Sequence, residues 1–324
     1  DEFYFPYARK IWGMEPAELS PVQAHKRVSS NSIMKLIKRL LPFGTVSHGT
    51  KTRGVFYYPR NGFGQISEAL GEAAANAGAD IRLGASVKSV LLGSGGHQVE
   101  YENQGKLHRL STQHVWSTIP ITILARFVQP TAPETVVEAA RSLRFRSMLL
   151  IYLVLDTPQF TPFDAHYLPG ADIRITRLSE PANYAARNET GKTTVICAEL
   201  PCQAGDQTWE MEDAALARLV REDLEQAGIP IRCDVSGVLV KRLLQAYPLY
   251  PAGFEKAFDL LDNWVEGLSN VLTFGRQGLY AHDNTHHALY MACGAAACLG
   301  DDGVFDHFMW AQERETFATH VVED

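Results

Sequence analysis

The sequence predicts a fold that combines α/β and α+β organisation, with helices and strands mixed along the chain. Amphipathic helical segments such as EDAALARLVREDLEQAG (212–228) alternate with strand-like runs. Four short strand-like pieces lie between residues 79 and 111, with the turns GSGG and NQG among them, as in an antiparallel meander. The apolar run SMLLIYLVL (147–155) is typical of a fully buried strand. Together these patterns exclude a pure helical or pure sheet class.

The first 80 residues are expected to be mainly helical. Residues 1–41 read as helices, with starts at Ser20-Pro21 and Ser30-Asn31. A loop is expected over 42–54, and VFYYP (55–59) reads as a short strand. The turn RNGFGQ (60–65) should lead into the amphipathic helix ISEALGEAAANAG (66–78), which Gly78 would end.

Strands and helices share the rest of the chain. Further helices are expected at 254–268 and 304–322. The expected strands are ADIRLGA (79–85), VKSVLLG (87–93), HQVEYE (97–102), KLHRLS (106–111), HVWSTIP (114–120), DIRITRLS (172–179), TTVICAEL (193–200), SGVLVKRLLQAYPLYP (236–251) and NVLTFG (270–275).

Composition limits the class of protein. A net charge of −7 and a pI near 5.9 argue against nucleic-acid binding. No apolar run reaches the roughly 18 residues that a membrane span needs. The odd number of cysteines, without CxxC spacing, indicates reduced thiols, so a cytoplasmic location is expected.

One motif points to a ligand. In FGRQGLYAHDNTHHALYMACGAA (274–296), Gly275 and Gly278 allow a tight turn and Arg276 offers a fixed positive fork. Asp283 and Asn284 suit a helix start, so a helix should begin at Thr285 with its free N–H groups available to a ligand.

Several stretches together resemble the FAD-dependent amine oxidase and protoporphyrinogen oxidase superfamily, to which UDP-galactopyranose mutase is related. The resemblance spans most of the chain, in the family's order. It is carried by YARKIWGMEPAELSP (7–21), FYYPRNGFGQISEAL (56–70), GADIRLGASVKSV (78–90), AYPLYPAGFEKA (246–257) and FGRQGLYAHDNTHHA (274–288).

The resemblance implies an FAD-binding, Rossmann-like domain formed by 55–120 plus 270–324, and a substrate-binding, partly helical domain formed by 1–54 plus 121–269. Within the first, the main chain of Val87 would meet the adenine, and the backbone N–H groups of Thr285 and His286, after Asn284, would face the flavin. The other positions implied to bind the cofactor are Arg60, Asn61, Gly62, Thr118, Ile119, Pro120, Gly275 and Arg276.

The sequence departs from the family at three points. Many relatives have glycine at the position of Asn61 and an acidic residue at that of His286. The family also begins with a strand and a GxGxxG turn that binds the pyrophosphate. GFGQIS (62–67) is not that fingerprint, because it follows a proline and lacks the acidic residue about 20 positions later. We therefore expect a truncated member that binds FAD weakly or not at all.

Substrate contacts are expected on one aromatic wall. The resemblance and the position of the tyrosines indicate Tyr57, Tyr58, Tyr247 and Tyr250, and Arg174, Arg177 and Lys241 could meet an anionic substrate. Catalytic residues are not identified. No metal site is expected, since His282, His286 and His287 read as loop and helix-start histidines.

Three functions remain open. The first is a flavin-dependent oxidoreductase that removes a hydride from an organic substrate, inactive in this truncated form. The second is a mutase-like isomerisation of a sugar nucleotide, as in UDP-galactopyranose mutase. The third is a non-catalytic remnant. The expected partners are a small-molecule substrate and, through an exposed sheet edge, a second copy of the chain.

Overall fold

The computed structural model describes residues 4–27, 57–184 and 191–322, which divide into two compact units. Unit 1 comprises Asp1–Ala17, Gly44–Ile81 and Phe145–Tyr247, and unit 2 comprises Glu18–Phe43, Arg82–Arg144 and Pro248–Asp324. These units are defined by packing alone, so the expected division into flavin-binding and substrate-binding domains stays a prediction. The expected helix and loop over 28–54 lie outside the described residues.

Unit 1 is built around one sheet with the strand order β10-β6-β9-β8-β7. The strands are β6 (Phe145–Leu155), β7 (Ala165–Tyr167), β8 (Arg177–Ser179), β9 (Thr194–Cys202) and β10 (Val235–Pro248), and the helices are α1 (Tyr4–Trp12), α4 (Gln65–Asn76) and α7 (Asp213–Gln226). Two 3-10 turns, η1 (Pro16–Glu18) and η2 (Pro181–Asn183), complete its regular structure within the described residues.

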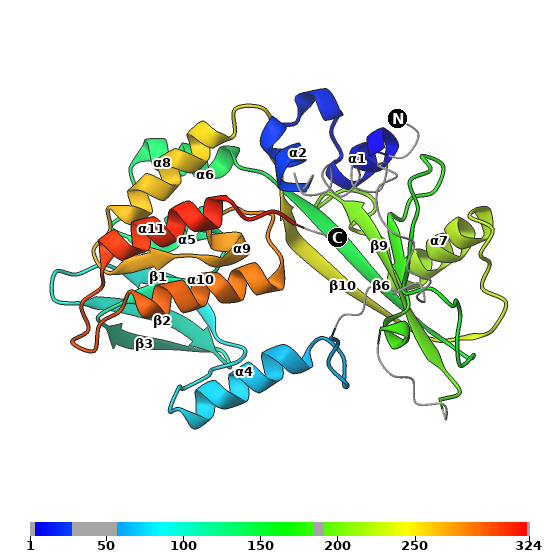
Figure 1. The fold of residues 1–324 in the computed structure, drawn as a ribbon, viewed down its shortest axis with the longest axis horizontal. Helices are drawn as coiled ribbons and strands as arrows, with labels where there is room; N and C mark the ends of the chain where they lie inside the picture. The colour runs from blue at the N-terminus through cyan, green and yellow to red at the C-terminus, as the bar shows by residue number, and fades with distance from the viewer. Residues whose placement is uncertain (1–3, 28–56, 185–190, 323–324) are drawn as a thin grey trace, which may run out of the picture. The chain divides into compact units, whose positions relative to one another are not determined.

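Strand β6 carries the apolar run noted in the sequence, and its alternate side chains form the core of unit 1. Leu149, Ile151 and Leu153 are fully buried and belong to one cluster with Leu216 and Val220 of α7. Figure 1 shows α7 beside the sheet that contains β6 and β9. Because successive strand residues point to opposite faces, Leu150 and Tyr152, which alternate with these three buried residues of β6, lie on the other face of the sheet.

Helix α1 is anchored to unit 1 by polar contacts to main-chain carbonyls. The Lys10 ammonium donates to the carbonyl of Leu168 and, at 3.0 Å, to that of Ile175. Arg146 Nε donates to the carbonyl of Ile11 at 3.1 Å. The KIWG segment therefore has a structural role in holding α1 against the sheet.

The Lys10 anchor should make stability depend on pH. Burial lowers the pKa of Lys10 to about 8, and the charges of Asp223 and Asp172 only partly oppose this. The unfolded chain then binds the proton more tightly, so the free energy of unfolding should rise as pH increases from about 8 towards the unfolded pKa of 10.5. Urea titrations of the wild type and of Lys10→Met at several pH values should show this rise as a growing difference between their free energies of unfolding, because the raised pKa values of Cys197 and Tyr152 act in the opposite direction in both proteins. A pH dependence that is unchanged in Lys10→Met would contradict the assignment.

Unit 2 contains two smaller sheets and most of the helices. The strands are β1 (Ser86–Leu91), β2 (His97–Asn103), β3 (Lys106–Thr112), β4 (Val115–Ser117), β5 (Val128–Gln129) and β11 (Val271–Thr273). The helices are α2 (Pro21–Arg27), α5 (Ile121–Phe127), α6 (Glu134–Ser142), α8 (Glu255–Glu266), α9 (Gly275–Gly278), α10 (Thr285–Ala297) and α11 (His307–Ala318). One sheet has the order β3-β2-β1-β5, and the other is the parallel pair β11-β4.

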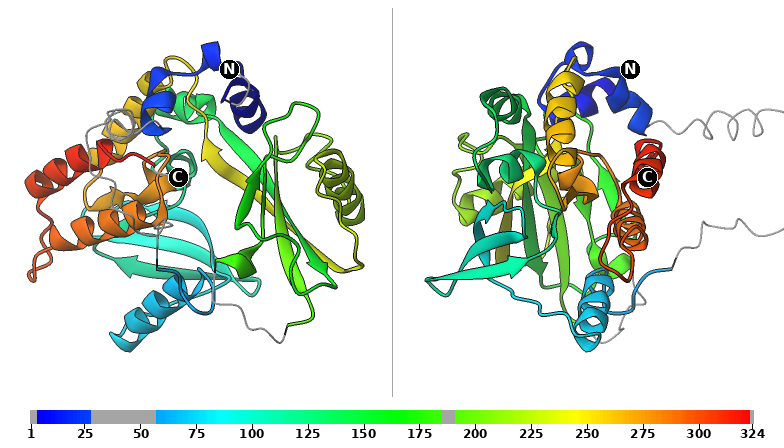
Figure 2. Two further views of the ribbon diagram at one scale, coloured as in Figure 1. Left: turned by 45° about the vertical axis from the view of Figure 1, so that its right-hand side comes forward. Right: turned by 90° about the vertical axis from the view of Figure 1, so that its left-hand side faces the viewer.

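Helices α10 and α11 lie side by side in both Figure 1 and Figure 2, and they contribute Met291, Ala295, Trp310 and Phe317 to one core cluster of unit 2. Gly294 of α10 is buried against α11. A Cβ atom there would stand 3.1 Å from Glu313 Oε2 and 3.3 Å from Phe317 Cζ. Part of the small-residue surface of α10 is therefore used for close packing of a neighbouring helix.

Several expected elements are confirmed. Helix α10 begins at Thr285, α7 is followed by Gly228, and β6 covers the whole apolar run. No helix among residues 4–27, 57–184 and 191–322 combines the length and apolar character that crossing a bilayer requires.

Three expectations about strands are wrong. Residues 79–85 form no strand, because Gly84 turns the chain at a φ of +70° and the Leu83 side chain is 87% exposed. Of the strand expected at 55–59, residues 57–59 are not in a strand, and residues 55–56 lie outside the described residues. In DIRITRLS only Arg177–Ser179 is strand, since the backbone N–H groups of Arg174 and Ile175 donate to the Asp223 carboxylate instead of to a neighbouring strand.

Candidate functional site

In unit 2, the parallel strands β4 and β11 end at residues predicted to bind a cofactor. Their register pairs Thr273 with Ser117, so Thr118 and Gly275 follow the two carboxyl ends. A Cβ atom on Gly275 would lie 3.8 Å from Thr118 Cγ2, which places the two residues side by side. Ligands of open α/β sheets commonly bind outside such carboxyl ends. Thr118, Gly275 and Arg276 are therefore placed where a ligand could bind.

The turn after β11 needs its glycines. Gly275 has a φ of +79°, a left-handed conformation that side chains rarely adopt. At Gly278 a Cβ atom would stand 2.6 Å from Thr273 Oγ1 and 3.3 Å from the carbonyl oxygen of Ser117. The two glycines therefore allow the short helix α9 to lie directly against the strand ends. Pro120 lies close by in the chain as the residue that precedes α5.

Helix α10 starts as the sequence predicted. Asn284 has the extended conformation of an N-cap, and its backbone N–H donates to Nδ1 of His287 at 3.2 Å. Thr285 and His286 are exposed. The first N–H groups of a helix lack partners within the helix, so those of Thr285 and His286 remain available to an electron-rich group.

Val87 lies on β1 at an irregular point of its sheet. The pairing of β1 with β2 shifts between Val87 and Ser89, and β1 pairs with β5 only at Val90 and Leu91. The main chain of Val87 is thus outside the hydrogen-bonded pairing of β1 with β5. A main-chain contact from Val87 to an adenine stays a prediction that this geometry permits.

Arg60, Asn61 and Gly62 belong to unit 1, in the turn that precedes α4. The backbone N–H of Asn61 donates to Oε1 of Gln65 at 3.1 Å, and Gly62 adopts a φ of +95°. This arrangement holds the turn in shape. Contact of these residues with a flavin stays a prediction.

The sheet face of unit 1 opposite α7 carries a row of polar side chains. Strand pairing aligns Tyr167 with Arg177, Arg177 with Glu199, and Glu199 with Leu150. A second row aligns Ser179 with Cys197 and Cys197 with Tyr152. Two further rings stack on one another near Arg177, those of Tyr58 and Tyr184, with centroids 5.6 Å apart. We call this surface the tyrosine face: Tyr58, Tyr152, Tyr167, Arg177, Tyr184 and Glu199.

Arg177 is the central charge of the tyrosine face. Its Nη2 donates to Glu199 Oε1 at 2.5 Å. Burial alone would lower the pKa of Arg177, but the Glu199 charge and a hydrogen bond with Tyr167 outweigh it and raise the pKa. Burial also raises the pKa of Tyr184, while the Arg177 charge acts in the opposite direction. The face therefore presents one stable cation and one carboxylate among aromatic rings.

Tyr152 of the tyrosine face and its neighbour Cys197 are both neutral near pH 7. Burial raises the pKa of Tyr152 to about 12, and it raises that of the Cys197 thiol to about 11. Both side chains thus keep their protons and remain hydrogen-bonding groups. Cys197 is consequently a poor nucleophile in this setting.

The four predicted wall tyrosines are placed differently. Tyr57 is fully exposed, and Tyr58 belongs to the tyrosine face. Tyr247 packs edge-on against Trp12 at 5.6 Å. Tyr250 is only 3% exposed, stacks on Phe254, and donates its hydroxyl to the carbonyl of Tyr280 at 2.6 Å. Substrate contact by these tyrosines stays a prediction, and the burial of Tyr250 favours a structural role for it.

The three cations predicted to meet an anionic substrate lie in different surroundings. Arg174 donates from Nε to Asp223 at 2.8 Å and from Nη2 to Glu222 at 2.9 Å, so it joins its loop to α7. Arg177 lies on the tyrosine face, and Lys241 lies exposed on β10. Sequence reasoning missed Tyr152, Tyr167, Tyr184 and Glu199. The signal for Tyr152 was the alternation within β6, whereas the others required the strand register.

Comparison with known families gives one clear match. The family model for flavin containing amine oxidoreductases matches residues 23–287, which is most of the chain. A comparison with curated proteins found no match.

Solved structures with similar folds include a reduced UDP-galactopyranose mutase. That match has a TM-score of 0.73 and 15% identity, and it covers 99% of this chain and 69% of the other. A protein described as a protoporphyrinogen oxidase from Exiguobacterium sp. matches with a TM-score of 0.55 and 17% identity, over 81% of this chain and 53% of that one. Wild-type putrescine oxidase bound to putrescine matches with a TM-score of 0.51 and 14% identity, over 68% and 49%. The chain therefore spans about half the length of the protoporphyrinogen oxidase and of the putrescine oxidase. These structural similarities confirm the expected fold class.

Proposed function

This chain belongs to the family of flavin containing amine oxidoreductases, and from that membership we propose that it provides flavin-contacting and substrate-contacting surfaces of a flavin-dependent oxidoreductase. The observation that carries the proposal is the tyrosine face. One side of the unit 1 sheet is closed by α7, while the other presents an arginine and a carboxylate among aromatic rings. Aromatic side chains with a few charged groups among them are typical of surfaces that bind a small polar substrate.

The residues of unit 2 fit the flavin end of FAD. The first N–H groups of α10 belong to exposed residues and would suit the electron-rich pyrimidine edge of a flavin, and the positive end of the helix dipole would stabilise the charge that a reduced flavin carries. Gly275 and Thr118 would line the ribityl chain, and Arg276 would supply positive charge. The sequence has no GxGxxG turn for the pyrophosphate. We therefore propose weak binding of FAD by this chain.

When bound, the flavin would accept the hydride, and the protein groups would bind and orient the substrate. On the tyrosine face, Glu199 can pair with a cationic amine and Arg177 with an anionic group, but each is already held by the other at 2.5 Å. A substrate that separates them must supply hydrogen bonds to both. This requirement favours substrates with a polar or charged group over purely apolar ones.

Absorbance of the purified chain across the flavin bands tests the proposal, with FAD added in excess and then removed by desalting. We expect flavin to bind in excess FAD and to be lost on desalting. Stoichiometric FAD after desalting would contradict weak binding and lead directly to anaerobic reduction assays with amines. Absence of any flavin binding, also by fluorescence quenching, would overturn the proposal and favour a non-catalytic remnant.

A second candidate is a mutase-like isomerisation. It is favoured by the likeness to UDP-galactopyranose mutase, which extends over 99% of the chain. Arg177 among tyrosine hydroxyls also suits a diphosphate group. The two functions separate in one assay with excess flavin. An oxidoreductase substrate reduces the flavin without air, whereas a mutase substrate is rearranged by reduced flavin without net oxidation.

A further inference from the structure

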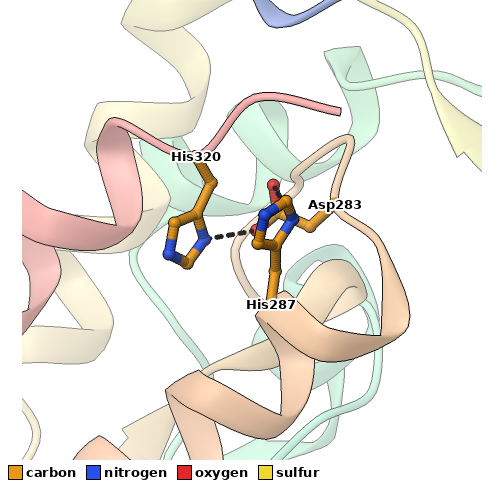
Figure 3. A group of neighbouring side chains, drawn as sticks. All are labelled: Asp283, His287 and His320. Carbon is orange, nitrogen blue, oxygen red and sulfur yellow. Dashed lines mark hydrogen bonds and ion pairs between the residues drawn. The ribbon is translucent and has the colours of Figure 1, made fainter. Parts of the chain in front are cut away.

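A cluster of one carboxylate and two imidazoles lies at the start of α10 (Figure 3). Asp283 precedes the helix, His287 is in its first turn, and His320 follows α11, 33 residues further along the chain than His287. His320 Nδ1 is 3.3 Å from Asp283 Oδ2, and His287 Nδ1 is 3.9 Å from Asp283 Oδ1. One donor atom from each residue lies within 4.8 Å of the others.

The Asp283 carboxylate is unusual for its burial. Its side chain has no exposed surface, and its Oδ1 accepts no hydrogen bond from any of the described residues. A buried carboxylate oxygen without a donor is costly, because it has lost its water without replacement. Oδ1 lies 3.9 Å from Nδ1 of His287, too far for a hydrogen bond, so it is able to accept a bond from a cation.

The ammonium of Lys26 is the nearby cation that acts on this cluster. Burial lowers the pKa of Lys26, and the negative charge of Asp283 only partly opposes this. Lys26 donates to the carbonyls of Ala318 and His320 at 3.0 and 2.9 Å, so its protons are directed at the main chain after α11. Lys26 thus positions the segment that carries His320 and leaves Asp283 Oδ1 without a hydrogen bond.

We propose that Asp283, His287 and His320 bind a divalent transition-metal ion of the Zn²⁺ class, with a fourth position open to water. Two imidazole nitrogens and one carboxylate oxygen are a donor set that suits such ions. Donors bound to one tetrahedral zinc lie roughly 3.4 Å apart, close to the 3.3 Å between His320 and Asp283. His287 and His320 retain 12% and 11% exposure, which gives an ion access.

Binding requires a local rearrangement. The rings of His287 and His320 are stacked, with centroids 4.3 Å apart and planes at 14°. Since a metal lies in the plane of each imidazole that it binds, the rings must rotate apart. His287 Nδ1 must also give up the hydrogen bond from the Asn284 N–H, which at 3.2 Å is long. The positive end of α10 opposes a cation, but three direct ligands outweigh a dipole at the helix surface.

Cobalt titration of the metal-stripped chain, with every affinity tag removed, tests the site. We expect one Co²⁺ per chain, visible d–d absorption of a four-coordinate ion, and displacement by Zn²⁺. In Asp283→Asn, His287→Ala and His320→Ala the Kd should rise about tenfold or more, since even the loss of outer-shell partners has that effect. His307→Ala is the matched control, because His307 is an exposed histidine on α11 outside the cluster.

Two results would overturn the proposal: no cobalt binding by the wild-type chain, or binding that survives all three cluster substitutions. Asp283→Asn could fail to fold because the residue is buried. His320→Ala then decides the matter, since it lies near the end of the chain and its folding can be checked by circular dichroism. Zn²⁺ should also raise the melting temperature of the wild type and of His307→Ala, and it should leave His320→Ala unchanged.

Discussion

Replacing Glu180 with alanine should lower the free energy of unfolding by about 3–5 kcal/mol, since several buried donors would lose their acceptor at about 1–3 kcal/mol each. Glu180 is fully buried in unit 1. Its carboxylate accepts the backbone N–H groups of Phe160 and Thr161, the Asn183 amide and the Thr194 hydroxyl. Urea denaturation of the wild type and the variant would measure the difference.

Glu222→Ala is the matched control for this experiment. Glu222 is 68% exposed and pairs with Arg174 at the surface, so its loss should change stability by less than about 1 kcal/mol. Glu180 also starts the turn η2, which leads into Tyr184 of the tyrosine face. A loss of less than 1 kcal/mol in Glu180→Ala would show that water replaces the carboxylate, and would contradict its role as the anchor of this segment.

Replacing Thr285 with proline should weaken flavin binding about tenfold, the effect of losing one hydrogen bond to a partly charged acceptor. Proline removes the backbone N–H that we propose to face the flavin. It is well tolerated at the first position of a helix, and Asn284, at φ −87° and ψ 170°, already has the extended conformation that proline requires of its predecessor. Quenching of flavin fluorescence would measure the change.

Two side-chain variants at the same position serve as controls. Thr285→Ala and Thr285→Val keep the N–H group, one with less bulk and one with equal bulk, so both should bind flavin as the wild type does. The helix content of all three should be unchanged, since Thr285 is exposed. Equal affinity of Thr285→Pro and wild type would remove the start of α10 from the flavin site.

The start of α10 was predictable because its determinants are local. Asn284 caps a helix by its own conformation, and the residues after it favour helix. The strand β6 was predictable because eight consecutive hydrophobic residues, 148–155, favour a buried strand, although only one of its faces is fully buried. Residues 79–85 were mispredicted because Gly84 overrides a strand-like composition.

The tyrosine face could be predicted only in part. The sequence alone singled out Tyr58 and Arg177, but their neighbours depend on the pairing of β6, β7, β8 and β9. A shift of one residue in any register would turn Glu199 or Tyr152 towards α7. Register is decided by the packing of the whole sheet, so pattern reasoning on single strands cannot supply it.

The sequence by itself carried the resemblance to the family, and it determined the strand β6 and the start of α10 at Thr285, because both elements depend on spacing and local conformation. Only the tertiary structure decided that Arg174 joins a loop to α7 and that Gly294 makes room for α11. It likewise decided that His320 meets Asp283 and His287. Contacts between distant segments form when chains fold back on one another, and the free energy that selects them comes from burial across the whole unit.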